Sequence, residues 1–149
     1  MKVHTQNLKT NYRYRATAEL KTSLNFIKLS NQTFQNCIDA CEACAELCNT
    51  CAADCKGKPG MELCIKLCLA CAEACSKCAS VCRSMNTNSA ESADQCAEAC
   101  RICAEACRAC AEECEKHSHI ESCKKCAEAC RKCETECKKC EAECKTVVA

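Results

Sequence analysis

Cysteine is the residue type in this chain with the clearest capacity for chemistry. The 149 residues include 25 cysteines, and the stretch CAEACRICAEACRAC at residues 96–110 places one at every third or fourth position. A thiolate is both a soft metal ligand and a redox-active nucleophile. The cysteines could therefore serve in metal binding or in thiol–disulfide chemistry, and their spacing has to distinguish the two.

The cysteines fall into four blocks that share one spacing. Within each block the gaps alternate strictly between three and four residues, which is the 3.5-residue period of an inward-facing helical seam. On a helix this spacing forms one narrow stripe, whereas a strand would place the thiols on both faces. The blocks are Cys37, Cys41, Cys44, Cys48, Cys51 and Cys55; Cys64, Cys68, Cys71, Cys75, Cys78 and Cys82; Cys96, Cys100, Cys103, Cys107, Cys110 and Cys114; and Cys123, Cys126, Cys130, Cys133, Cys137, Cys140 and Cys144.

Short segments between the blocks carry signals that end one helix and begin the next. In KGKPG, Gly57 suits the left-handed position after a helix and Pro59 suits a first helical turn. NSAE at 88–91 is a capping signal, and SHIE at 118–121 has the S-x-x-E pattern of a capping box. We therefore expect an all-α fold: an antiparallel up-down-up-down four-helix bundle over residues 34–149, with helices of about 22–28 residues and inward-facing cysteine stripes.

The first 33 residues differ in kind from the rest. They contain no cysteine, and together with Phe34 they hold all four aromatic residues of the chain. Leu20, Leu24 and Ile27 recur at helical spacing. We expect residues 1–33 to form an N-terminal extension that is partly helical and, over about its first 14 residues, disordered.

Hydrophobic packing alone does not account for the stripes. No aromatic residue follows Phe34, and large aliphatic residues are sparse beyond it. A core of Cys and Ala loses about 0.8 kcal/mol for each methylene that Leu would have buried. Over about two dozen positions this deficit is as large as the whole stability of a typical domain, about 5–15 kcal/mol. The thiols are therefore expected to serve a purpose other than packing.

Composition excludes several classes of function. Twenty-one basic and 20 acidic residues give a net charge of +1, so no basic field indicates a nucleic-acid partner. No apolar run approaches the roughly 18 residues of a membrane span, and the N-terminus lacks the apolar region of a signal peptide. We therefore expect a cytoplasmic protein, in a compartment where thiols stay reduced. No nucleophile–base pair indicates an enzyme, and no catalytic residue is predicted.

Among metals that prefer thiolate, Cu(I) fits the stripes best. Structural zinc needs one closed tetrahedral site, not six or seven layers of thiols. The C-x2-C-x2-C-x3-C run of iron–sulfur proteins is absent, because two gaps of three never follow one another. Cu(I) accepts two-sulfur sites and bridging thiolates, so the array predicts about 12 to 25 ions. Roughly one monocation per thiolate would also neutralise charge that a core cannot otherwise hold.

One end of the bundle is predicted to be the mouth through which copper passes. Met61, His117 and His119 continue the stripes beyond the last cysteines, and thioether and imidazole are exchangeable ligands. Histidines exposed in a short turn are the alternative interpretation. The mouth is expected to gather Cys55, Met61, Cys64, Cys114, His117, His119 and Cys123. The predicted metal ligands are therefore all 25 cysteines together with Met61, His117 and His119.

The other end of the bundle is predicted to be closed. The residues in register there are Phe34, Met85 and Val147. They form an expected apolar plug, with Met85 as an alternative metal ligand.

The repeated C-x-x-x-C and C-x-x-C stripes on four helices, over about residues 34–146, resemble the cysteine-rich copper storage proteins. This resemblance implies a four-helix bundle filled with Cu(I) and a cytosolic or exported store without catalysis. It also implies bundles that assemble as homo-oligomers. The lack of a visible export signal matches the cytosolic branch, and a copper chaperone or an efflux protein is a candidate partner.

Three other functions stay open at this point. A metallothionein-like zinc or cadmium buffer would use the same thiols at about four per ion. A thiol/disulfide redox protein would need an exposed cysteine of low pKa. A purely structural bundle would hold its cysteines as disulfides.

Overall fold

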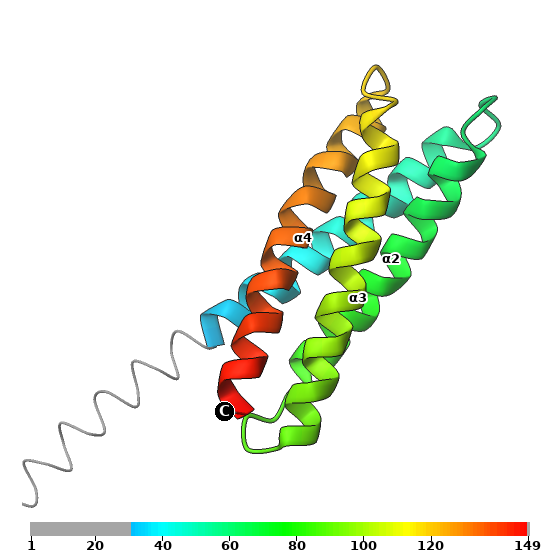
Figure 1. Ribbon diagram of the computed structural model, residues 1–149. Coiled ribbons are helices and arrows are strands. Elements are labelled where there is room, and N and C mark those ends of the chain that lie inside the picture. Colours follow the sequence, from blue (N-terminus) through cyan, green and yellow to red (C-terminus); the bar gives the residue numbers. More distant parts are fainter. Residues whose placement is uncertain (1–30, 149) are drawn as a thin grey trace, which may run out of the picture. The chain divides into compact units, whose positions relative to one another are not determined.

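The structure, a computed structural model, describes the backbone of residues 31–148 and the side chains as far as residue 146. Four helices follow one another in this part of the chain (Figure 1). The first occupies residues 31–55, and it is followed by α2 (Glu62–Arg83), α3 (Ala90–Glu115) and α4 (Glu121–Val148). No strand interrupts residues 31–148. The predicted all-α bundle is confirmed, and α2, α3 and α4 have 22, 26 and 28 residues, within the predicted lengths.

The predicted N-terminal extension lies outside the described residues as far as residue 30. Its expected helix, with Leu20, Leu24 and Ile27, belongs to that part. The extension and the domain boundary at residue 34 therefore stay predictions.

Neighbouring helices run antiparallel, as short connections require. Contacts between cysteine sulfurs show this directly, because residue numbers rise along one helix while they fall along its neighbour. The pairs are Cys37–Cys78 and Cys44–Cys71 for helix 31–55 with α2, Cys71–Cys107 and Cys78–Cys100 for α2 with α3, and Cys103–Cys133 and Cys110–Cys126 for α3 with α4. Helix 31–55 also lies against α4, through Cys44–Cys130 and Cys51–Cys123.

The turn between helix 31–55 and α2 is built on two glycines. Gly57 has φ +82° and Gly60 has φ +78°, both in the left-handed region that glycine enters at little cost. The predicted role of Gly57 after the helix is confirmed. The prediction for Pro59 is wrong, because the second left-handed residue prolongs the turn and α2 begins only at Glu62.

The two remaining turns differ in how they begin the next helix. Ser89 caps α3, and its hydroxyl accepts a hydrogen bond from the Ser92 backbone N–H at 3.2 Å. The capping box predicted at Ser118 is wrong. There the Ile120 N–H donates to the His117 carbonyl at 2.9 Å, which closes one more turn and delays α4 until Glu121.

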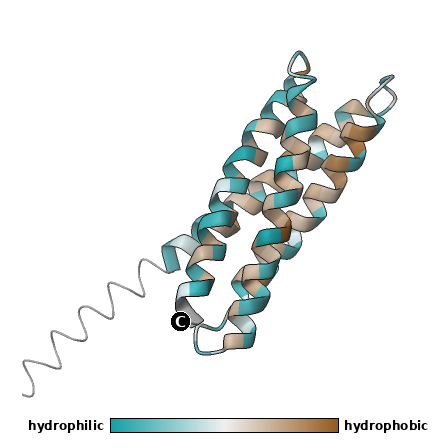
Figure 2. Cartoon of the chain, viewed as in Figure 1, coloured by the Kyte–Doolittle hydropathy of each residue, from teal (hydrophilic) through white to brown (hydrophobic). Residues whose placement is uncertain are grey.

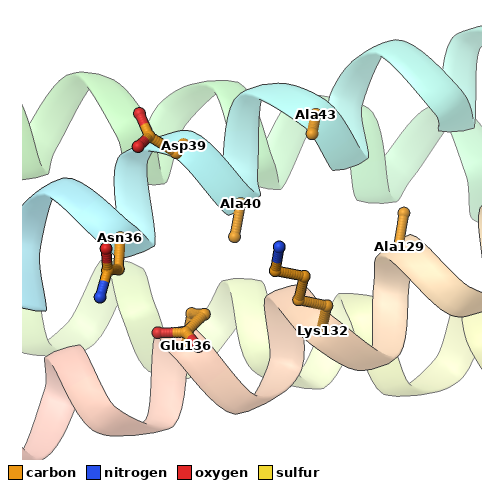
Figure 3. A pocket seen from close by; sticks show the side chains of 7 residues that line it. All are labelled: Asn36, Asp39, Ala40, Ala43, Ala129, Lys132 and Glu136. Atoms are coloured by element: carbon orange, nitrogen blue, oxygen red, sulfur yellow. The ribbon is translucent and has the colours of Figure 1, made fainter.

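Small residues and charges cover the flanks of the bundle. Ala40, Ala43 and Ala129 lie in a shallow groove between helix 31–55 and α4, where their size lets the two helices approach closely (Figure 3). Most charged residues face outward; Arg101, for example, pairs with Glu98 at 2.6 Å. Figure 2 shows that the covering is uneven, since α2 is the most apolar helix and α4 the most hydrophilic.

Candidate metal centre

All 25 cysteines point into the bundle. Their exposed fractions are 0%, except for Cys82 at 5% and Cys144 at 1%. All 25 thiols are free. The predicted inward-facing stripes are therefore confirmed, and most residues of the core are cysteines.

The sulfurs form one continuous array. Most Sγ atoms lie within 4.0 Å of at least one other Sγ atom, as in the Cys51–Cys55 pair at 4.0 Å, and the shortest of these distances is 3.4 Å between Cys82 and Cys96. Contacts also cross the axis between helices that are diagonally opposed, which leaves no apolar seam between the stripes. These diagonal pairs are Cys41–Cys103 at 3.9 Å, Cys71–Cys130 at 3.9 Å and Cys82–Cys140 at 3.8 Å.

Many of the sulfurs cluster in fours. Within each group all Sγ atoms lie within 4.8 Å of one another, a spacing that a single soft ion can bridge. Each of the five groups given below shares at least one cysteine with another of them, so an ion in one group would use a sulfur that also belongs to a second group. Five such groups are Cys37/Cys82/Cys100/Cys140, Cys37/Cys41/Cys78/Cys137, Cys41/Cys103/Cys133/Cys137, Cys44/Cys48/Cys71/Cys130 and Cys44/Cys75/Cys107/Cys133.

Burial makes most of the mouth thiols hard to ionise. It raises the pKa of Cys64 to about 11, and it also raises the pKa values of Cys55 and Cys123. Near the opposite end of the array, hydrogen bonding with Cys100 and Cys137 lowers the pKa of Cys37 to about 7. An array without metal therefore holds protons that a bound cation has to displace.

The structure brings the cysteines of the predicted mouth together. Cys55 and Cys123 lie 3.6 Å apart between helix 31–55 and α4, and Cys64 and Cys114 lie 3.8 Å apart between α2 and α3. Met61 is 3% exposed and packs into the same core just before α2. The turns 56–61 and 116–120 lie at the same end of the bundle in Figure 1.

The two predicted mouth histidines differ in exposure. The His117 side chain is 20% exposed, and its Nε2 lies 3.1 Å from Oε1 of Glu113. His119 is exposed, in the turn beyond α3. The two rings meet edge to face, with centroids 6.3 Å apart. Of the two, only His117 is held against a buried group.

Glu113 is a residue that the sequence analysis did not single out. It is 8% exposed, and Oε2 also lies 3.2 Å from the Lys116 ammonium nitrogen. The contact with His117, together with Lys116, keeps the pKa of Glu113 below its ordinary value. The signal that could have found it is the i,i+4 spacing of a glutamate and a histidine at the end of a helix.

The opposite end of the array is apolar. Phe34 is 7% exposed and Ile38 is 6% exposed, and Met85 is half-buried against the same core. The backbone of Val147 is helical, but its side chain lies outside the described part. The structure thus places two of the three predicted plug residues at this end.

The flanks of the bundle hide the array. The groove of Figure 3 is lined by Asn36, Asp39, Ala40, Ala43, Ala129, Lys132 and Glu136. A second groove, between α2 and α3, is lined by Lys77, Val81, Glu91, Asp94, Gln95, Glu98, Ala99 and Ile102. Neither groove includes a cysteine, so neither gives an ion direct access to sulfur.

None of the helices in residues 31–148 combines the length and apolarity that crossing a bilayer requires.

Comparison with known proteins gave structural relatives and a family. One relative is a cytosolic copper storage protein from Streptomyces lividans, whose structure shows copper loading with five coppers. It is 34% identical to this chain, with a TM-score of 0.71. The match covers 77% of this chain and 97% of that one. The Streptomyces lividans copper storage protein loaded with 10 copper equivalents is 32% identical with a TM-score of 0.66, over 74% and 85% of the two chains.

A variant of the Streptomyces lividans copper storage protein, with two histidines replaced by alanine, is 33% identical to this chain with a TM-score of 0.70. The match covers 76% of this chain and 96% of the variant. No curated protein sequence matches the chain. The sequence profile described as "Copper storage protein" matches residues 30–147, a span that contains every cysteine. The chain therefore belongs to the copper storage protein family.

Proposed function

We propose that this protein stores copper as Cu(I), with the ions held as cargo along the inside of the bundle. The observation that carries the proposal is the continuous array of 25 buried, free thiols. The proposed ligands are all 25 cysteines, with Met61, His117 and His119 at the mouth. Cu(I) selects thiolate and thioether ligands and tolerates low coordination numbers, so every layer of the array can be used.

Charge favours a monovalent cargo. About six Zn(II) ions with four thiolates each would leave a net charge of about −13 on 25 thiolates. About one Cu(I) per thiolate would leave the core neutral. Uncompensated charge in a buried core is costly, so a full load of Cu(I) is the more stable arrangement.

A zinc or cadmium buffer is the second candidate function. The groups of four sulfurs within 4.8 Å of one another favour it, because tetrahedral thiolate sites suit both metals. Competition between Cu(I) and Zn(II) for the protein distinguishes these two candidate functions. Cu(I) should displace Zn(II) from the protein, and excess Zn(II) should not displace Cu(I).

The burial of the thiols favours metal storage over catalysis, because a catalytic thiol has to be accessible to its substrate. The thiols that a redox or hydrolytic reaction would need are 0–5% exposed. We infer that the protein is not an enzyme. We place it in the cytosol, where thiols stay reduced and where the similar Streptomyces lividans protein is found.

Exposed apolar residues support an assembly of several bundles. Leu63 is 52% exposed and Leu69 is 51% exposed, both on α2. We infer that the protein forms a homo-oligomer, and that a copper chaperone or an efflux protein exchanges copper with it. Light scattering of the purified chain tests the first inference.

Anaerobic titration of fully reduced protein with Cu(I), against a competing Cu(I) chelator, tests the storage function. We expect more than ten equivalents to bind and free-thiol reactivity to fall in parallel. Replacing Cys44, Cys75, Cys107 and Cys133 together by Ser should lower the capacity by about two to four ions. A matched variant with Ser at the exposed Ala43, Ala53, Ala70 and Ala142 should keep it. Binding of only one or two ions by the unsubstituted protein would rule out storage.

A further inference from the structure

Two carboxylates are buried in the described part of the bundle, and they have different partners. Glu134 is 9% exposed; Oε1 lies 3.2 Å from Arg131 and Oε2 lies 3.0 Å from Lys138. Both of its oxygens therefore face permanent cations, which is an ordinary structural arrangement on α4.

Glu113 has one cation and one imidazole. The Lys116 partner is 69% exposed, so this ion pair contributes little. The His117 partner is only 20% exposed, at a distance of 3.1 Å. The buried side of the carboxylate is therefore committed to the imidazole of His117.

This contact determines which ring nitrogen carries the proton. An ionised carboxylate only accepts hydrogen bonds, so the nitrogen that faces it, Nε2, has to be the donor. A neutral ring then keeps its lone pair on Nδ1. Histidines that bind metals almost always donate their other N–H in this way, often to a carboxylate.

We propose that Glu113 is a positioning residue, which fixes His117 as the Nε2–H tautomer and makes Nδ1 the copper-binding nitrogen of the mouth. The proposal rests on the copper-storage function. His117 lies one turn beyond Cys114, whose sulfur is 0% exposed and 3.8 Å from Cys64 and from Cys68. Because Cu(I) prefers thiolate to imidazole, an ion held at His117 is expected to pass on to these sulfurs.

The tautomer of His117 can be measured in the full chain without any substitution. Long-range ¹H–¹⁵N correlation of the metal-free, reduced protein at mildly alkaline pH should show the proton on Nε2 of His117. A His117→Ala variant assigns the signals. A proton found on Nδ1 would overturn the proposal, whether or not the protein binds copper.

The rate of Cu(I) uptake tests whether the contact between Glu113 and His117 matters for copper binding at the mouth. Glu113→Gln should slow stopped-flow transfer of Cu(I) from a chelator complex by about 10-fold, while the final capacity stays the same. Glu134→Gln is the matched control, since Glu134 is equally buried and also adjoins a cysteine, and it should keep the original rate.

A double substitution shows whether Glu113 acts through the histidine. In a His117→Ala background, Glu113→Gln should have no further effect on the rate. An unchanged rate in the single Glu113→Gln variant, or an equal slowing in both backgrounds, would contradict the proposal. If the unsubstituted protein takes up no more than one or two ions, it is the storage function that fails, and the tautomer measurement still decides the role of Glu113.

Discussion

The two ends of the bundle continue the same four stripes with different chemistry. At the mouth, the stripes end in Met61 and His117, with the carboxylate of Glu113 beside them. At the far end they end in Phe34 and Met85, packed against the sulfur core. From this difference we infer that the cysteine stripes would set the capacity of the proposed store, and that the residue in register just beyond the last cysteine would decide whether an ion can pass.

The turns at the two ends also differ in their backbone conformation. The turn 56–61 contains both positive-φ residues of the described chain, Gly57 and Gly60, and a side chain added at either would meet no atom within 4 Å. The turn at the far end has no positive-φ residue and is instead held by the cap at Ser89. The mouth turn is therefore open around its glycines.

Removing the aromatic ring at the closed end should have the largest effect on stability. Phe34→Ala should lower the free energy of unfolding by about 3 kcal/mol, because it leaves a cavity against the core. The rate of Cu(I) uptake should not change if ions pass only at the mouth. Urea unfolding and stopped-flow uptake check both statements, and faster uptake by Phe34→Ala would show that the far end also admits ions.

The next effect is a loss of stability of the metal-free protein at alkaline pH. Burial raises the pKa of Cys64 to about 11 from its ordinary 9.0, so the unfolded chain releases this proton first. The contribution of the neutral thiol to stability is therefore complete below pH 9.0 and is lost as the pH rises toward 11.

Urea unfolding from pH 8 to about pH 11 in the presence of reductant measures this loss. Replacing Cys55, Cys64 and Cys123 by Ser should make this loss of stability smaller, because serine does not titrate in this range. The copper-loaded protein should show no such loss, since its thiolates are already coordinated. Equal pH dependence of the loaded and the metal-free protein would contradict the account.

Exchanging the methionines separates a ligand from a plug. Met61→Leu and Met85→Leu keep the side-chain volume, so each should change stability by less than about 1.5 kcal/mol. Met61→Leu should slow Cu(I) uptake several-fold, because the mouth loses its thioether, whereas Met85→Leu should not. Slower uptake by Met85→Leu alone would reverse the assignment of the two ends.

The smallest effects concern the turns. Gly57→Ala should cost about 1 kcal/mol, since φ +82° is unfavourable for alanine although the space around it is open. Ser89→Ala at the other end should cost about the same, through the lost cap. Thermal unfolding measures both changes. Neither variant should change the copper capacity, and a loss of bound ions in either would mean that the turns hold copper.

Much of the fold could be predicted because one residue type recurs with a helical period. Alternating gaps of three and four residues leave only one face of each helix for sulfur, and that face has to point inward. The antiparallel order followed from the short connections. Gly57 was predictable for a local reason, since few other residues enter the left-handed region.

The mouth could be predicted only in part, because its geometry depends on turns. The carbonyl of His117 accepts a hydrogen bond from Ile120, and this extra turn moves the start of α4 to Glu121 and leaves His119 exposed. Glu113 looks like one of many surface glutamates in the sequence. Its i,i+4 spacing from His117 indicates the contact between the two side chains, but its burial depends on how α3 packs.

Copper K-edge X-ray absorption of the fully loaded protein tests the central claim most directly. The account predicts a Cu(I) edge and a first coordination shell made almost entirely of two to three sulfur atoms per ion. A shell dominated by nitrogen or oxygen, or an edge of Cu(II), would contradict the claim that the buried thiols hold the metal.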